Sequence, residues 1–197
     1  MKTILVLSII IIILLVFVIK LWLKIRLVNK KIKYVDQANE WHKLAVTDSL
    51  TGVHNRNAYD LYISEIETGV KAQLIGVILF DVDDFKIIND TKGHLAGDIV
   101  LKNVAKILSE VFCETQYKVF RIGGDEFSVI TEGVCEQEII ERLLVLKKRL
   151  EADGTVSLSK GYSIIKNSPQ EAFKYADDML YADKLSKKLR SSLSKDT

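Results

Sequence analysis

The sequence predicts an α/β (α+β) fold: a ferredoxin-like, palm-type βαββαβ core with additional flanking helices, preceded by one transmembrane helix and a linker helix. Three observations lead to this expectation. Short apolar runs bounded by turn residues alternate with amphipathic segments in the order strand, helix, strand, strand, helix, strand. A long apolar run opens the chain. Acidic residues stand where the first and third strands should meet.

Residues 1–23 are expected to form a transmembrane anchor. The run Ile4–Leu23 is almost wholly apolar and supplies the roughly 20 residues that a membrane helix needs, with Lys20 snorkelling to the surface. A cleaved signal peptide is the alternative, but the run is long and no small-residue cleavage site follows it. Basic residues cluster after the span, which predicts a single-pass protein with its globular part in the cytoplasm.

Residues 24–47 are expected to form a linker helix. Five apolar residues recur there at spacings of four and three, the heptad pattern of a short parallel coiled coil: Leu21, Ile25, Val28, Ile32 and Val35. An isolated linker helix with an apolar stripe fits the same pattern. The pattern therefore predicts a helix and leaves its pairing with a second chain open.

The charge is unevenly distributed along the chain, whose net charge is +2. From Asp36 onward, 26 Asp and Glu exceed 21 Lys and Arg, so the expected globular domain at 48–190, with a flexible tail at 191–197, is mildly acidic. This argues against a nucleic-acid-binding groove. The two cysteines, Cys113 and Cys135, fit no metal or redox spacing and are expected to be reduced thiols.

The elements of the core follow from periodicity and turn residues. Strands are expected at 74–80, 118–122, 127–130 and 155–163, and helices at 56–67, 98–111, 138–150 and 170–189. In this topology the first and third strands are antiparallel neighbours, so Asp81 should lie near Asp125 and Glu126. Converging carboxylates repel one another unless a cation joins them, and oxygen ligands suit Mg²⁺. An acidic first turn of a helix is the simpler interpretation of Asp81, but it leaves the acidic hairpin unexplained.

The chain resembles the GGDEF family, the diguanylate cyclases, over roughly residues 48–188. Five stretches in the family's order carry the resemblance: Asp48–Arg56; Phe80–Asp90 with Gly93-His94 and Gly97-Asp98; Gly123-Gly124-Asp125-Glu126-Phe127; Ser157–Gly161; and Ala176–Tyr181 with Lys184. The resemblance implies a bacterial membrane enzyme that condenses two GTP into cyclic di-GMP, releases two pyrophosphates and acts as a homodimer through its catalytic face.

The resemblance also implies roles for individual residues. The metal ligands would be Asp81, the carbonyl of Val82, Asp125 and Glu126, around two Mg²⁺ ions per site, with Mn²⁺ as the alternative. The catalytic residues would be Asp125, Lys86 and Glu126. The substrate-binding residues would be Asn89, His94, Asp98, Gly123, Gly124, Lys184 and Lys188. Asn89 and Asp98 would read guanine, and Lys184 would meet the triphosphate.

Other interpretations stay open at this point. His94 could cap a turn, and Lys86 or Lys184 could be a solvated surface charge. A catalytically silent GGDEF domain that binds GTP or recruits a partner is the alternative function. Another nucleotidyl transferase on the same fold is a third.

The chain departs from the family's pattern in three places. Glu114-Thr115-Gln116-Tyr117 stands where many members carry an Arg-x-x-Asp motif that binds the product and inhibits the enzyme. Lys187-Lys188-Leu189 stands where the closing helix usually reads Gly-Arg-Asn, so Lys188 replaces an arginine. Lys160 occupies a usually apolar place. We therefore expect weak product inhibition and an unchanged reaction class.

Overall fold

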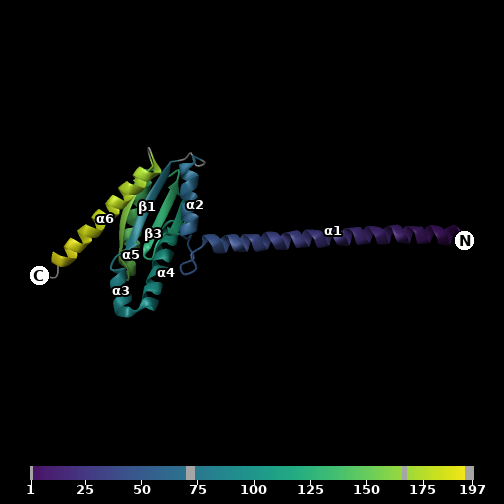
Figure 1. Ribbon diagram of the computed structural model, residues 1–197, viewed down its shortest axis with the longest axis horizontal. Helices are drawn as coiled ribbons and strands as arrows, with labels where there is room; N and C mark the ends of the chain where they lie inside the picture. Colours follow the sequence, from purple (N-terminus) through teal and green to yellow (C-terminus); the bar gives the residue numbers. More distant parts are fainter. Residues whose placement is uncertain (1, 70–73, 166–167, 194–197) are drawn as a thin grey trace. The chain divides into compact units, whose positions relative to one another are not determined.

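The computed structural model describes residues 2–69, 74–165 and 168–193; the side chains of 2–14, 16, 35–39, 42, 191 and 193 lie outside this description (Figure 1). The chain divides into two compact units, Met1–Leu44 and Ala45–Thr197. Each unit is described by itself below.

Helix α1 (Lys2–Val46) runs without interruption through the predicted anchor and the predicted linker, a stretch that contains neither proline nor glycine. Among the residues that the structure describes, it contains no helix that is both long and apolar enough to cross a membrane. The structure therefore gives the predicted anchor no support. More than half of the predicted span, Ile4–Leu23, has side chains outside the described residues.

The second unit is a mixed α+β domain around a four-stranded antiparallel sheet, as predicted. The strands are β1 (Ile75–Val82), β2 (Tyr117–Arg121), β3 (Glu126–Glu132) and β4 (Leu158–Ile164). Their order across the sheet is β2-β3-β1-β4, and every neighbouring pair is antiparallel. This order puts β1 in the middle, between the glycine-rich β2–β3 hairpin and the edge strand β4.

Helices cover both faces of the sheet. The helices of this unit are α2 (Arg56–Glu67), α3 (Phe85–Lys92), α4 (His94–Val111), α5 (Glu136–Asp153) and α6 (Pro169–Leu193). On one face, α4 and α5 pack against the sheet around buried residues such as Phe80, Leu108 and Phe127. On the other face, α2 and α6 pack around Phe120 and Ile130 (Figure 1). Burying apolar side chains on both faces is what holds the sheet together.

The structure corrects several predicted boundaries. The segment before the predicted helix at 98–111 contains an additional short helix, α3, and α4 already begins at His94. Gly93, with φ +82° and ψ 162°, separates the two helices because this extended backbone with positive φ, which glycine tolerates, ends α3. Helix α6 extends to Leu193, into the segment 191–197 that was predicted to be a flexible tail, and residues 194–197 lie outside the described residues.

Candidate active site

The end of β1 lies beside the beginning of β3. Asp81 pairs in register with Glu126, and the Val82 N–H donates a hydrogen bond to the Asp125 carbonyl oxygen at 3.2 Å. The antiparallel pairing thus brings together the three acidic residues that the sequence places far apart. Asp125 is half-buried and Glu126 is exposed.

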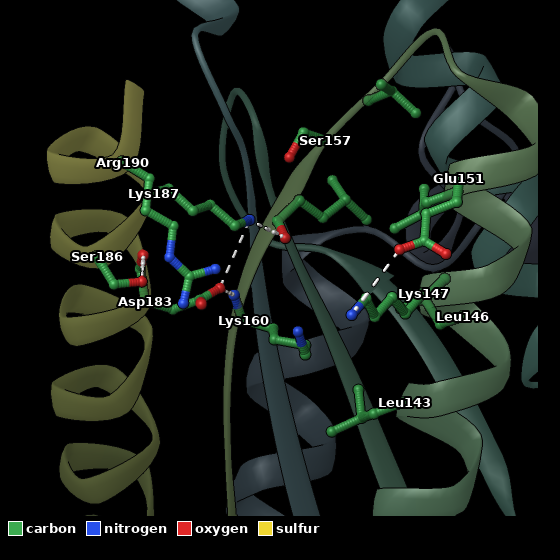
Figure 2. Close-up of a pocket in the computed structure, with 13 residues that line it drawn as sticks. Leu143, Leu146, Lys147, Glu151, Ser157, Lys160, Asp183, Ser186, Lys187 and Arg190 are labelled. Carbon is green, nitrogen blue, oxygen red and sulfur yellow. Dashed lines mark hydrogen bonds and ion pairs between the residues drawn. The ribbon is translucent and has the colours of Figure 1, made fainter. Parts of the chain in front are cut away.

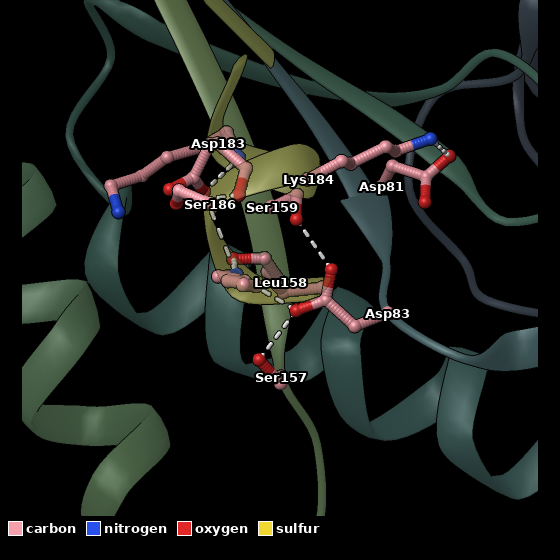
Figure 3. A network of polar contacts seen from close by, with 10 residues as sticks. Asp81, Asp83, Ser157, Leu158, Ser159, Asp183, Lys184 and Ser186 are labelled. Carbon is pink, nitrogen blue, oxygen red and sulfur yellow. Dashed lines mark hydrogen bonds and ion pairs between the residues drawn. The ribbon is translucent and has the colours of Figure 1, made fainter. Parts of the chain in front are cut away.

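Asp81 is the buried carboxylate at this edge, with 8% of its surface exposed. Its Oδ2 atom forms an ion pair with Lys184 Nζ of α6 at 2.6 Å (Figure 3). Burial raises the pKa of Asp81; the Lys184 ammonium opposes that rise, while the charges of Asp125 and Asp83 add to it. The neighbouring carboxylates therefore repel Asp81, and a cation relieves that repulsion.

The glycine-rich hairpin is held by Arg121, the last residue of β2. Its guanidinium donates hydrogen bonds to the Gly124 carbonyl oxygen at 2.8 and 3.2 Å. The same guanidinium donates to both carboxylate oxygens of Asp48, at 3.2 and 3.3 Å. Asp48 also accepts from the Thr51 N–H at 2.9 Å and from the Thr51 hydroxyl at 2.6 Å. The first motif of the domain thus fixes the turn that carries Asp125.

These contacts set the charge state of Asp48. Burial raises the pKa of its carboxyl, but the hydrogen bonds from Thr51 and Arg121 outweigh burial, so the pKa lies below its ordinary value. Asp48 is therefore a carboxylate at neutral pH, which keeps the Arg121 link charge-assisted on the Asp48 side.

The two glycines of the hairpin have different surroundings. A Cβ atom at Gly123 would collide with the Glu126 carboxylate, whereas one at Gly124 would meet open space. Gly123 therefore lies against the carboxylate end of Glu126, an exposed and flexible side chain. The expectation that both glycines let the backbone approach a nucleotide stays a prediction.

On the other side of Asp81, Asp83 is the centre of a polar network (Figure 3). Its carboxylate accepts hydrogen bonds from the hydroxyls of Ser157 and Ser159 and from Lys187 Nζ, the last at 2.7 Å. Burial raises the pKa of Asp83, but the contacts with Lys187 and the two serines outweigh it and lower the pKa overall. This network ties the segment after β1 to β4 and α6.

The remaining predicted residues lie on three helices. Lys86 and Asn89 are on α3, His94 and Asp98 on α4, and Lys184 and Lys188 on α6. Lys86, His94 and Lys188 are exposed, whereas Asn89, Asp98 and Lys184 are half-buried.

Asn89 lies against the start of α4. A Cβ atom at Gly97 would collide with Asn89 Oδ1, so the glycine lets the two helices approach closely. The Oδ1 atom is buried and has no hydrogen-bond partner among the described residues. A buried acceptor without a donor is costly, which makes this atom a candidate ligand-binding group.

The donors at the β1–β3 edge suit a hard cation such as Mg²⁺, because they are carboxylate and carbonyl oxygens. The Lys184 ammonium stands beside Asp81 where a cation would be expected. Within residues 2–69, 74–165 and 168–193, however, no group of three or more acidic, His or Cys side chains is close enough to hold a metal together. The donor chemistry fits, and Lys184 would have to leave Asp81 to complete it.

A pocket of about 380 Å³ lies between α5, β4 and α6 (Figure 2). Its lining includes Lys160, Asp183 and Lys187 but none of the predicted site residues. The candidate active site is therefore the sheet edge at Asp81. Sequence reasoning gave no role to Arg121, Asp83 or Lys187, although all three contact this edge or its neighbours.

Comparisons with known proteins agree with this architecture. Residues 45–190 match the family described as diguanylate cyclase, GGDEF domain. An uncharacterized membrane protein of Staphylococcus aureus (strain USA300) is 32% identical over 152 residues, which cover 70% of this chain and 42% of that protein. The chain thus spans less than half the length of this curated relative.

Two solved structures from Caulobacter crescentus have a similar fold. The GGDEF domain of DgcB in complex with c-di-GMP is 29% identical with a TM-score of 0.64, covering 72% of this chain and 91% of that one. The coiled coil and GGDEF domain of DgcB, also with c-di-GMP, is 26% identical with a TM-score of 0.70, covering 83% and 95%. With the family match over residues 45–190, these findings show that the chain belongs to the GGDEF-domain family.

Proposed function

We propose that this chain is a diguanylate cyclase, which condenses two GTP molecules into cyclic di-GMP and releases two pyrophosphates. The observation that carries the proposal is the edge where Asp81 pairs in register with Glu126, beside Asp125 on the glycine turn. The family match and the DgcB domains, which were solved with c-di-GMP, support it.

The reaction forms one phosphodiester bond per GTP. Each 3′-hydroxyl attacks the α-phosphorus of the other GTP, and the bond to the β-phosphate breaks as pyrophosphate leaves. Asp125 would favour loss of the hydroxyl proton, Lys86 would stabilise charge on the phosphate, and Glu126 would assist at the same edge. Mg²⁺, when bound by Asp81, the Val82 carbonyl, Asp125 and Glu126, would polarise the phosphate and stabilise the leaving pyrophosphate.

Guanine would be recognised by the helices after β1. Asn89 Oδ1 is a buried acceptor with no partner among the described residues, and the N–H edge of guanine offers donors. Asp98 would accept from the same edge, since it lies one residue after the Gly97 that Asn89 packs against. His94, at the start of α4, would border the nucleotide.

The triphosphate would be held from α6. Lys184 Nζ forms an ion pair with Asp81 Oδ2. On GTP and metal binding, we expect Lys184 to leave Asp81 and to contact the triphosphate. The exposed Lys188 would add a second positive charge, although a lysine lacks the bidentate fork of the arginine that it replaces.

One site holds one GTP and the product contains two, so two chains must meet face to face. A membrane anchor at residues 1–23 with a cytoplasmic domain would concentrate the chains, and the S. aureus relative is named a membrane protein. The residues Leu21, Ile25, Val28 and Ile32 lie on helix α1 at spacings of four and three, and this stripe would pair the helices of two chains in parallel.

A catalytically silent, GTP-binding GGDEF module is the rival function, favoured by the Lys184–Asp81 ion pair at the expected metal position. Product analysis of the full chain with Mg²⁺ and equal GTP and ATP separates the two. We expect cyclic di-GMP as the main product. GTP bound but unchanged would establish the rival function instead, and a mixed or adenine-containing product would contradict the assignment of Asn89 and Asp98.

A further inference from the structure

The outer edge of β4 is capped by two side chains of α6. Because β4 is an edge strand, its outward N–H and C=O groups lack a strand partner. The Lys160 N–H donates to Asp183 Oδ2 at 3.0 Å, and the Leu158 carbonyl accepts from Lys187 Nζ at 2.6 Å. The backbone N–H and C=O groups of residues two apart in a strand point to the same edge. Asp183 and Lys187 therefore bond to this edge of β4 in place of a neighbouring strand (Figure 2).

The Lys187 ammonium group lies close to three oxygen atoms in this region. Besides the Leu158 carbonyl, its Nζ atom lies 2.7 Å from Asp83 Oδ2 and 3.5 Å from Asp183 Oδ2. A lysine ammonium has three N–H donors, and three oxygen atoms surround this one. Lys187 therefore joins α6 both to the edge of β4 and to the segment that follows β1.

This clamp determines where Lys184 stands. Positions three apart lie on the same face of a helix, so fixing Lys187 fixes the rotation and height of Lys184 on α6. In that position Lys184 Nζ reaches Asp81 Oδ2 at 2.6 Å. Gly161 permits the close approach, because a Cβ atom there would collide with the backbone of α6 at Ala176.

We propose that Lys187 is a positioning residue of the nucleotide site, which holds α6 in the register that presents Lys184 to the Asp81 edge. The inference rests on the proposed function in assigning Lys184 to the triphosphate. The family pattern usually has glycine at this position, which offers no side chain. In this chain the Lys187 side chain supplies the contact between α6 and β4.

Replacing Lys187 should have two separable consequences. Removing a partly buried cation leaves Asp83 and Asp183 without their shared counter-charge, and the Leu158 carbonyl loses its donor. The β4 edge should then open more often, and α6 should lose its fixed register. Arginine keeps the charge but changes its geometry, so Lys187→Arg should restore the edge only in part.

The experiment compares the full chain with Lys187→Met, Lys187→Arg and the control Lys174→Met, which removes an exposed lysine from the same helix. Amide hydrogen exchange without ligand reads the β4 edge, and binding of the fluorescent analogue mant-GTP with Mg²⁺ reads the nucleotide site. For Lys187→Met we expect at least tenfold faster exchange at the Lys160 amide and roughly tenfold weaker mant-GTP binding. Lys187→Arg should fall between, and Lys174→Met should match the parent.

The outcomes separate this inference from the proposed function. Faster exchange with unchanged mant-GTP binding would make Lys187 merely structural and overturn the inference, as would no change in either measurement. A parent that binds mant-GTP but forms no cyclic di-GMP would sink the cyclase proposal while the inference stands. A parent that does not bind mant-GTP would overturn both.

Discussion

Two supports flank Asp81, and they are built differently. On the β3 side, the Arg121 guanidinium joins Asp48 to the Gly124 carbonyl and fixes the hairpin. On the β4 side, the Lys187 ammonium joins α6 to Asp83 and to the Leu158 carbonyl. One support is a planar fork that joins residues of two recognisable motifs, and the other is a point charge at a position where the family pattern usually has glycine.

The difference shows which contacts tolerate substitution. A guanidinium binds two acceptors at fixed angles, so its replacement by lysine should fail. An ammonium on a flexible stem accepts varied geometry, so its replacement by arginine should succeed in part. The hairpin support carries Asp125, the proposed catalytic residue, whereas the α6 support carries Lys184, which we propose to contact the triphosphate. Damage to the first should therefore affect turnover, and damage to the second should affect affinity.

The largest effect is expected at the hairpin itself. Asp125→Ala removes a proposed metal ligand at the turn, not a core contact, and should lower cyclic di-GMP formation at least about a hundredfold with the fold intact. The measurement is turnover at saturating GTP and Mg²⁺, with circular dichroism as the check on folding. Glu141→Ala, the loss of an exposed carboxylate on α5, is the control. Equal turnover in Asp125→Ala and the parent would remove Asp125 from the metal site.

The next effect tests the arginine fork. Arg121→Lys keeps the charge but replaces a rigid fork of N–H donors by one ammonium, which does not reproduce the geometry toward both Asp48 and the Gly124 carbonyl. We therefore expect roughly a tenfold lower kcat with a similar KM for GTP. Arg149→Lys, at a surface ion pair with Glu110, is the matched control. If Arg121→Lys has the kinetics of the parent, the fork is not what positions the hairpin.

A smaller effect concerns stability and pH. The folded-state pKa of Asp48 is lowered, so its contribution is present above the unfolded pKa of about 3.9 and is lost as pH falls through the lower folded-state value. We expect Asp48→Asn to lower the free energy of unfolding by about 1 kcal/mol at pH 7, after allowing for solvent screening, and by less below pH ~4. Urea titrations at several pH values measure this difference. A difference that grows toward acid pH would mean that the pKa is raised instead.

The smallest expected effect is that of the product on the rate, because we expect no inhibition by cyclic di-GMP. Arg142 lies against Glu114, with its guanidinium 5.5 Å from the Tyr117 ring centroid, so this arginine is already engaged beside the stretch that replaces the inhibitory motif. Glu114 would also repel an anionic dinucleotide. Adding cyclic di-GMP at micromolar concentrations should leave the initial rate unchanged. Inhibition that Glu114→Ala abolishes would place a product site there after all.

Much of the fold was predictable because it depends on periodicity. Apolar alternation and turn residues located the four strands, and the topology then required Asp81 to lie near Asp125 and Glu126. The helix α3 was missed because it is only eight residues long and begins after Asp84, a non-glycine residue with φ 57°. Asp84 is a residue type that often caps a helix, but its side chain makes no capping hydrogen bond here.

The supports of the site were less predictable than its ligands. Lys187 and Asp183 act through the open edge of β4, and which strand lies at an edge is known only once the strand order is known. Arg121 stands next to the recognisable turn, but one of its acceptors, Asp48, lies 73 residues away in the sequence, and the other is the backbone carbonyl of Gly124. Side-chain pairings of this kind depend on tertiary geometry, which no local pattern encodes.

Two supports that act independently should meet at Asp81, and a double-mutant cycle measures whether they do. The measurement is kcat/KM for cyclic di-GMP formation by the parent, Arg121→Lys, Lys187→Met and the double variant. If the supports are independent, the fold losses of the single variants multiply, because their free energies add within roughly 0.5 kcal/mol. The supports are not independent if kcat/KM of the double variant is no lower than that of the more impaired single variant. The two contacts would then belong to one network.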